Sequence, residues 1–361
     1  MKILLPIKGE YIERILRGEK KYEYRHTLAS ENVEKIILYA TAPQSMIVGE
    51  VDVIGRVVKT PTALWEETKK HAGISRKKFR EYFHGRKEAK AYVLGTAVTY
   101  SEKIPLDELG IEHAPQSFAY LTECPICSKI ITKNIRADNF TTAKSEEHII
   151  PLSLGNDQLV LPPGTICDEC NNYFARKIEK DFLSNEVISI LRSYHVVPNR
   201  KRKIPSLEVQ FGAQKTKLEI DPKNNCCYIG LSEETINSLR RGKIECFSSP
   251  SINIEKIKDD YATSRFLIKV FLEVALYYSI KYHKGEAKFF VLDEKMKELS
   301  QYVRVGSKER RIYDYSVAKR NPVVPFSSDD FVASIKLNFG ERNTLVGMTL
   351  NLYELEFTLT I

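Results

Sequence analysis

Between residues 1 and about 120, short apolar runs alternate with segments in which apolar residues recur at helical spacing. The stretch EYIERILRGEK (10–20) repeats apolar residues at helical spacing and stops at Gly18. PTALWEETKKHAG (61–73) and SRKKFREYFHG (75–85) predict two more helices that end at glycine. The predicted strands are KYEYR (21–25), KIILYA (35–40), MIVGEVDVIGRVV (46–58), which bends at Gly49 and Gly55, and KAYVLGTAVTY (90–100). Strands with helices beside them predict a small curled sheet or barrel.

The pattern changes after about residue 121. DECNNYFARKIEKDFL (168–183) predicts a helix, and TSRFLIKVFLEVALYYSI (263–280) is apolar enough to predict a buried one. Four alternating runs predict strands: SLEVQFG (206–212), TKLEID (216–221), VASIKLNFG (332–340) and TLNLYELEFTLTI (349–361). We therefore expect an α+β multidomain protein, with domains at residues 1–121, 122–185 and 186–361. The sequence assigns no role to the last of these.

Composition narrows the class of protein. Of 361 residues, 43% are hydrophobic and 28% are charged, which is typical of soluble globular proteins. Charges recur every few residues in the N-terminal stretch MKILLPIKGEYIERIL, and no apolar run approaches the roughly 20 residues that span a bilayer. We therefore expect a cytoplasmic protein without a membrane partner. The net charge of +8 permits a polyanionic partner and serves solubility equally well.

Four of the seven cysteines form two matched pairs. Cys124-Pro-Ile-Cys127 and Cys167-Asp-Glu-Cys170 each place two sulfurs on one side of a turn. An odd number of cysteines in a cytosolic chain argues against a full set of disulfides. Two such turns complete a tetrahedral site, so we expect one structural Zn²⁺ bound by four cysteines.

The stretch EEHIIPLSLGN (146–156) raises the question of what His148 does. From the residues alone it is a buried structural histidine, a zinc ligand or a general base. The four cysteines already complete the zinc site, which leaves His148 without that task. Residues 124 to about 180 combine Cys-x-x-Cys, Glu-His-Ile-Ile-Pro and Cys-x-x-Cys-Asn before a helix. This set resembles the HNH endonucleases of the zinc-bearing, four-cysteine kind, in which a β-hairpin and a helix form a ββα-metal core.

The resemblance implies roles for three residues. His148 would be the general base that activates water, while Glu147 and Asn171 would bind a catalytic Mg²⁺ or Mn²⁺; Asn172 is the alternative to Asn171. Glu147 and His148 alternate along a strand, so a twisted hairpin or a bulge must bring both to the ion. Leu161 and Pro162 stand where the family has its middle asparagine, and Asn156 is the candidate to replace it. The opposing interpretation is a zinc ribbon with a buried histidine and no activity.

The N-terminal stretch resembles the ASCH domains of the PUA-like superfamily. The segments that carry the resemblance are GEKKYEYR (18–25), LYATAPQSMIVGEVDV (38–53), TALWEETKKHAGI (62–74) and HAPQSFAYL (113–121). PUA-like folds are small β-barrels that bind RNA or read modified bases. Lys21, Glu23 and Arg25 share one strand face and predict a ligand cleft, whereas the family resemblance points to Lys20, on the other face. The remaining predicted cleft residues are Tyr39, Thr41, Gln116 and Ser117.

Together, the two resemblances favour a modification-dependent DNA endonuclease of the phage-defence type. The ASCH-like domain would read a modified base, which in duplex DNA requires flipping the base into a pocket. A double-strand cut needs two HNH centres or two successive nicks, which favours a homodimer. The alternatives are an RNA-binding nuclease and a zinc-stabilised nucleic-acid-binding regulator without catalysis.

Overall fold

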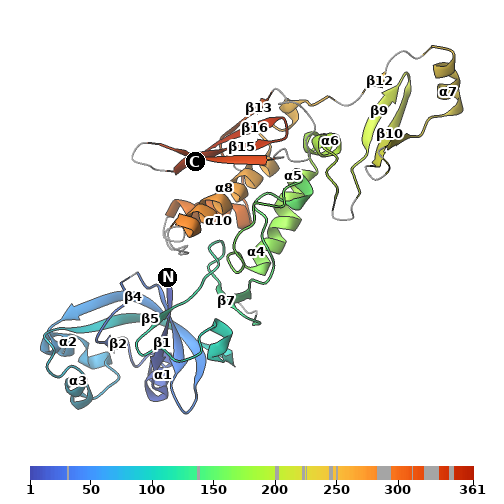
Figure 1. The fold of residues 1–361 in the computed structure, drawn as a ribbon. Coiled ribbons are helices and arrows are strands. Elements are labelled where there is room, and N and C mark those ends of the chain that lie inside the picture. The colour runs from blue at the N-terminus through green and yellow to red at the C-terminus, as the bar shows by residue number, and fades with distance from the viewer. Residues whose placement is uncertain are drawn as a thin grey trace. The chain divides into compact units, whose positions relative to one another are not determined.

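The computed structural model describes residues 1–30, 32–135, 139–199, 203–221, 224, 226–243, 247–248, 251–282, 294–310, 312–320, 333–340 and 345–361. The chain divides into two compact units (Figure 1). Unit 1 comprises Met1–Cys124 and Ser128–Ala143, and unit 2 comprises Pro125–Cys127 and Lys144–Ile361. The boundary predicted at residues 185 and 186 stays a prediction.

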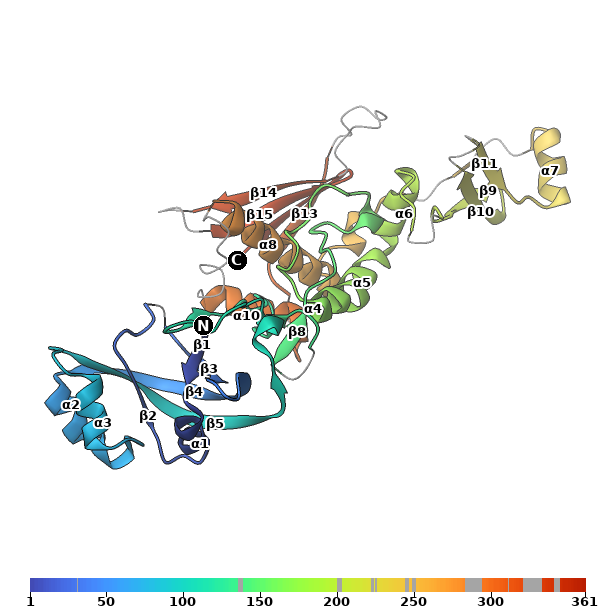
Figure 2. The ribbon, with the colours of Figure 1, turned by 60° about the horizontal axis from the view of Figure 1, so that its bottom comes forward.

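Unit 1 is built on a curled six-stranded sheet of order β2-β5-β4-β3-β1-β6 (Figure 2). Its strands are β1 (Lys2–Ile7), β2 (Tyr22–Arg25), β3 (Lys35–Ala40), β4 (Met46–Lys59), β5 (Ala89–Ile104) and β6 (Ala119–Tyr120). β1 and β3 are parallel, and the other neighbours are antiparallel. The register of β4 against β5 shifts at Gly49 and Gly55, where the sequence predicts bends. A side chain at Gly49 would stand 2.3 Å from the carbonyl oxygen of Val98, so only glycine fits there.

Short helices pack against the interior strands β3, β4 and β5 of this sheet. They are α1 (Gly9–Leu16), α2 (Pro61–Thr68) and α3 (Arg76–Tyr82), with the 3₁₀ turns η1 (Lys69–His71) and η2 (Leu106–Leu109). The hydroxyls of Thr60 and Ser75 cap α2 and α3 by accepting backbone N–H bonds, and Pro61 occupies the first helical position. A two-stranded parallel ladder, β7 (Ile130–Thr132) and β8 (Phe140–Thr142), completes the unit. The mixed α+β fold with a curled N-terminal sheet confirms the sequence prediction.

Unit 2 contains a continuous helical run over the residues predicted as one helix. The run comprises α4 (Asp168–Tyr173), the π-helical turn η4 (Phe174–Glu179) and α5 (Lys180–Leu183). The other helices are α6 (Glu186–Tyr194), α7 (Glu233–Arg240), α8 (Tyr261–Tyr282) and α10 (Glu294–Val305), with 3₁₀ turns η3 (Leu152–Leu154) and η5 (Ile254–Lys256). All residues of α8 from Thr263 to Leu276 are buried, which confirms the predicted buried helix. Within the described part of the chain, no helix has the length and apolarity to cross a membrane.

Two antiparallel sheets complete unit 2 (Figure 1). One has the order β13-β16-β15-β14 and lies along α8; its strands are β13 (Tyr315–Lys319), β14 (Ala333–Phe339), β15 (Leu345–Leu352) and β16 (Leu355–Thr360). The other has the order β11-β10-β9-β12, with strands β9 (Leu207–Phe211), β10 (Gln214–Asp221), β11 (Cys226–Ile229) and β12 (Phe247–Ser248). Residue 332 of one predicted strand lies outside the described residues. The ring of Phe182 from α5 stacks on Phe266 of α8 at 3.9 Å and joins the helices to the first sheet through Phe357.

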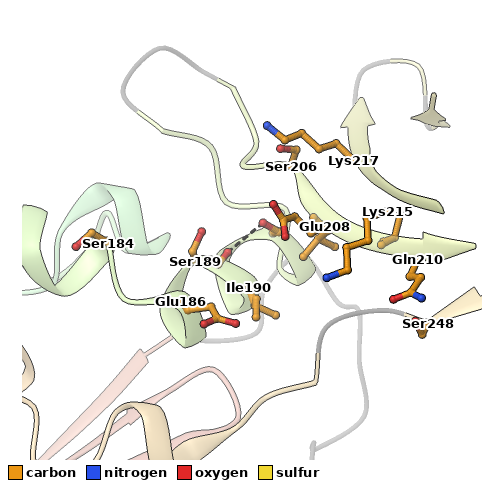
Figure 3. Close-up of a pocket in the computed structure, with 13 residues that line it drawn as sticks. Ser184, Glu186, Ser189, Ile190, Ser206, Glu208, Gln210, Lys215, Lys217 and Ser248 are labelled. Atoms are coloured by element: carbon orange, nitrogen blue, oxygen red, sulfur yellow. Dashed lines mark hydrogen bonds between the residues drawn. The ribbon is translucent and has the colours of Figure 1, made fainter. Parts of the chain in front are cut away.

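A hollow of about 640 Å³ opens between α6 and strands β9 and β10 (Figure 3). Serine side chains, two glutamates and two lysines line most of it. The charged groups are Glu186 and Glu208 against Lys215 and Lys217. Among the described residues that line the hollow, the positive and negative side chains balance in number.

Candidate active site and metal centre

The two cysteine pairs converge. The Sγ atoms of Cys124, Cys127, Cys167 and Cys170 all lie within 4.8 Å of one another. The Sγ atoms of Cys127 and Cys167 are 3.7 Å apart, and a tetrahedral zinc with bonds of about 2.3 Å requires sulfurs about 3.8 Å apart. Among the described residues, no other group of three or more His, Cys, Asp or Glu side chains is placed to hold a metal. The donor set and its spacing therefore fit the predicted zinc.

Local turns aim the thiols at one point. The backbone N–H of Ser128 donates to the carbonyl oxygen of Cys124 at 2.8 Å and closes the first turn. Cys167 caps the start of α4, because its Sγ accepts from the N–H of Cys170 at 3.4 Å. A helix start favours negative charge, so α4 stabilises the thiolate form that zinc requires.

His148 lies on a very short hairpin. It forms an isolated antiparallel bridge with Val160, flanked by the bonds Ile149 N–H to Leu159 O and Leu161 N–H to Glu147 O, both 2.9 Å. The predicted strand is thus reduced to a single bridge. The His148 side chain is half-buried, and its Nδ1 is a buried atom without a hydrogen-bond partner.

The loop of this hairpin is held by an asparagine, as the sequence suggested. The buried Asn156 donates from Nδ2 to the carbonyl oxygen of Ile150 at 3.2 Å. Gly155, with φ of +86°, turns the chain at the end of η3. Leu161 is buried and Pro162 is exposed, so neither substitutes for the middle asparagine. Asn156 buttresses the loop from its other side.

Side chains at the start of α4 form hydrogen bonds with the segment that leads to His148. The buried Asp168 carboxylate accepts from the N–H of Lys144 at 2.9 Å and from the N–H and hydroxyl of Ser145 at 2.8 and 2.6 Å. Asn171 donates from Nδ2 to the carbonyl oxygen of Glu146 at 2.7 Å, next to the Glu147–His148 pair. Sequence reasoning missed Asp168, whose only signal is its place in the first turn of the helix.

The side chains of the two candidate ligands, Asn171 and Asn172, form hydrogen bonds with different parts of the chain. Because the amide nitrogen of Asn171 is committed to Glu146, its carbonyl oxygen remains as the atom for a cation. Asn172 instead donates to the carbonyl oxygen of Asp168 in its own helix, at 2.7 Å. This arrangement favours Asn171 over Asn172 as a ligand.

Glu147 points into the protein interior. Its side chain is 4% exposed, and Oε1 lies 2.8 Å from Nζ of Lys269 in α8. Oε2 is buried without a hydrogen-bond partner. Burial raises the pKa of Glu147 even though Lys269 acts in the opposite direction. Burial alone would lower the pKa of Lys269, but Glu147, Glu273 and Glu179 hold it well above its usual value, so the side chain is an ammonium ion.

Sequence reasoning also missed Lys269. It stands far along the chain from Glu147, and motif spacing does not reach it. The available signal was its position in the apolar run 263–280, where Glu273 follows one helical turn later. A charged residue in the middle of a buried helix requires a partner. That partner cannot be named from the sequence.

A cleft of about 490 Å³ in unit 1 contains most of the predicted ligand residues. Those that line it are Lys20, Glu23, Arg25, Thr41 and Gln116, together with Tyr11, Tyr24 and Tyr82. The other three predicted residues lie elsewhere. Lys21 is exposed outside the lining, Tyr39 is 6% exposed in the hydrophobic core, and Ser117 is half-buried beside the cleft residue Gln116.

The strand start explains why Lys20 rather than Lys21 lines the cleft. β2 begins at Tyr22, so the alternation of faces does not extend back to either lysine. Lys20 is 3% exposed and lies 3.3 Å from Glu23, which pairs with Arg25 at 3.0 Å. Burial lowers the pKa of Lys20 against the pull of Glu23. Arg25 donates from Nη2 to the carbonyl oxygen of Pro6 at 2.6 Å, and its Nε is buried without a partner.

Comparison with known proteins supports both sequence resemblances. Residues 5–104 match the ASCH domain family, and residues 124–186 match an HNH endonuclease family. An ASCH domain-containing ribonuclease of Zymomonas mobilis is 28% identical over 86 residues, which are 24% of this chain and 58% of that protein. The crystal structure of ASCH from Zymomonas mobilis is 25% identical, covers 34% of this chain and 87% of that chain, and has a TM-score of 0.32.

Other curated relatives share only a segment with this chain. The ATP synthase subunit alpha of Ureaplasma parvum is 28% identical over 120 residues, which are 33% of this chain and 15% of that subunit. The chain therefore spans less than two thirds of the length of these relatives. The family matches assign the domains: the chain carries an ASCH domain at residues 5–104 and an HNH endonuclease domain at residues 124–186.

Proposed function

We propose that the protein is a metal-dependent HNH endonuclease that hydrolyses DNA phosphodiester bonds, and that its ASCH domain reads a modified base in restriction of phage DNA. The HNH match suggests nuclease activity, and the ASCH match suggests nucleic-acid binding. The observation that carries the proposal is the bond from Asn171 to Glu146, because it brings the helix to the residues that precede His148.

His148 is the proposed general base. Hydrolysis of a phosphodiester needs a water molecule in line with the leaving oxygen and a group that removes its proton. Histidine is the side chain most often used for this step. The backbone bonds of Ile149 and Leu161 flank His148 in the hairpin, and its half-buried ring stays partly accessible to a substrate.

Asn171 and Glu147 are the proposed holders of Mg²⁺ or Mn²⁺. Both ions prefer oxygen ligands, and the carbonyl oxygen of Asn171 and the unpartnered Oε2 of Glu147 are oxygens of that kind. When bound, the ion would stabilise the negative charge on the phosphate and the leaving oxygen. Asp168 supports both groups by anchoring residues 144 and 145 to the same helix.

The unit 1 cleft is the proposed base-reading site. Its volume falls within the range of small-molecule sites and accommodates a flipped base. Tyr11 and Tyr82 offer partly exposed rings for stacking. The unpartnered Nε of Arg25 is a donor for a base edge.

Arg25→Gln is expected to lower the preference for modified over unmodified DNA about tenfold, because a hydrogen bond from a charged donor contributes roughly 1.5–3 kcal/mol. The measurement is the ratio of initial cutting rates on the two substrates. Lys21→Gln removes the same charge four residues earlier, outside the cleft lining, and is expected to leave the ratio unchanged. Equal ratios for both variants would remove Arg25 from the reading site.

RNA cleavage is the second candidate function. It is favoured by the similarity to a Zymomonas mobilis protein named an ASCH domain-containing ribonuclease. In this alternative the cleft of unit 1 would hold an unpaired RNA base, and the HNH domain would cut the same strand or its neighbourhood. The two candidates share His148 and differ in the nucleic acid they cut.

The discriminating experiment compares substrates of one sequence. Purified protein with Mg²⁺ or Mn²⁺ is given duplex DNA that is unmodified, cytosine-methylated, hydroxymethylated or glucosylated, and the matching RNA. Cutting restricted to one modified DNA supports the proposal, and cutting restricted to RNA supports the alternative. Tight binding to one substrate without cutting of any would make the protein a regulator.

A further inference from the structure

The ammonium group of Lys269 is surrounded by oxygen atoms from two parts of the nuclease domain and from its own helix. Lys269 is 0% exposed, and five oxygens lie within 3.3 Å of its Nζ. They are Glu147 Oε1 (2.8 Å), Glu273 Oε2 (2.9 Å), Glu179 Oε1 (3.0 Å), His148 O (3.0 Å) and Ile149 O (3.3 Å).

From this arrangement we propose that Lys269 is a positioning residue of the nuclease centre. It would hold the backbone of His148 and the carboxylate of Glu147 in the geometry that cleavage requires. The inference rests on the proposed function, since it assigns Lys269 to the reaction of that same site.

The bonds of Lys269 constrain the hairpin where ordinary strand pairing does not. The hairpin has a single bridge at His148, so its ladder is too short to define the position of this residue. Lys269 donates to the carbonyl oxygens of His148 and Ile149, which lie on the strand that carries the proposed base. The same Nζ holds Oε1 of Glu147 and leaves Oε2 without a partner, so the orientation of the proposed ligand depends on Lys269.

The π-helical turn η4 brings the third carboxylate to this point. Glu179 ends η4, and Phe174 begins it with its ring 5.8 Å from Nζ of Lys269. The wider π turn shifts the residues that follow it relative to a regular α-helix, and such turns occur often at functional sites. Lys269 thus links the hairpin to the helix that carries Asn171.

Stability alone does not account for this cluster. Replacing a buried ion pair with apolar residues of similar volume is often neutral or stabilising, so such pairs are weak evidence for a stabilising role. The neighbours of Lys269 along α8, from Phe266 to Leu272, are apolar and buried, and an apolar residue would suit the packing of this helix. The five oxygens instead match a role in fixing the hairpin.

The inference also gives a role to part of the C-terminal region. The HNH match ends at residue 186, whereas Lys269 lies well beyond it in α8. A second residue of that region reaches the same hairpin: the hydroxyl of Tyr353 donates to the carbonyl oxygen of Leu154 in the loop at 2.9 Å. Residues of α8 and of the β15–β16 turn therefore complete the nuclease unit.

The test uses the double variant Lys269→Met/Glu273→Met. It replaces the ion pair within α8 by two apolar side chains of similar volume, a change that is often neutral or stabilising for a buried pair. The variant is therefore expected to fold and keep its zinc. Lys281→Met, on the exposed end of the same helix, is the matched control.

The expected result is a kcat reduced about 100-fold with an unchanged KM for the DNA, because small misplacement of reacting groups has an effect of this size. Mn²⁺ affinity without substrate, measured by electron paramagnetic resonance, is expected to fall about tenfold, since Glu147 loses its orientation. If Lys269 had only a structural role, the double variant would melt at a lower temperature without a fall in kcat at unchanged KM. A double variant with the kcat and Mn²⁺ affinity of the wild type would overturn the inference.

Hydrogen exchange distinguishes failure of the positioning role of Lys269 from failure of the proposed nuclease function. If the wild-type protein cuts nothing, the proposed function fails, and exchange of the amides of Ile149 and Leu161 still tests Lys269. Faster exchange of these two amides in the double variant, with unchanged exchange in α8, supports the positioning role. Unchanged exchange at both places contradicts it.

Discussion

His148→Ala is expected to reduce the rate of cleavage by about 10²- to 10⁴-fold, the usual contribution of a general base. The fold is expected to survive, because the contacts that place His148 in the hairpin use its backbone: the bridge to Val160 and the bond from Lys269 to its carbonyl oxygen. The measurement is single-turnover cleavage, with zinc content and thermal melting recorded on the same sample.

An exposed histidine provides the control for this substitution. His84→Ala is expected to retain wild-type cleavage, because His84 is exposed in unit 1. If His148→Ala lost its zinc and melted at a lower temperature, His148 would be a structural residue of a zinc ribbon. Full activity in the variant would remove it from the reaction.

Cys170→Ser is expected to release zinc and unfold the region around the four cysteines. Structural zinc sites have apparent binding free energies of about 10–16 kcal/mol, which is comparable with the 5–15 kcal/mol that stabilises a typical domain. Loss of the zinc is also expected to weaken the start of α4, because Cys167 caps this helix and Cys170 lies in its first turn. Elemental analysis and melting curves measure both effects, and cleavage is expected to disappear with them.

Cys227→Ser is the matched control, because Cys227 is exposed and lies outside the cluster. It is expected to keep about one zinc per chain. Wild-type protein with no zinc, or Cys170→Ser with an unchanged melting curve, would refute the structural zinc site.

The elements of unit 1 were predictable because local patterns determine them. Glycines followed the helical segments, strands alternated, and Gly49 marked a bend at which the nearby carbonyl oxygen of Val98 leaves room only for glycine. Strand alternation gave the wrong lysine for the cleft. It predicted Lys21, whereas the neighbouring Lys20 lines the cleft. Strand alternation holds only inside a strand, and β2 begins at Tyr22.

The candidate site was predictable as far as its motif extends. The spacing of the two cysteine pairs was enough to predict that their sulfurs converge. The sequence also pointed to Asn156 as a residue that could support the loop, where it donates to the carbonyl oxygen of Ile150. Lys269 was not predictable, because its partners depend on how α8 packs against the hairpin. Its burial beside three carboxylates is a property of tertiary structure, and a single sequence gives no signal that joins residues so far apart.

The most direct test of the nuclease assignment is nicking of a plasmid by the purified full chain under controlled metal conditions. A panel of unmodified and modified plasmids is incubated first with EDTA and then with excess Mg²⁺ or Mn²⁺. Nicking that is absent with EDTA, appears with Mg²⁺ or Mn²⁺ and disappears in His148→Ala is the predicted result. No nicking of any plasmid by folded, zinc-loaded wild-type protein in the presence of either ion would contradict the account.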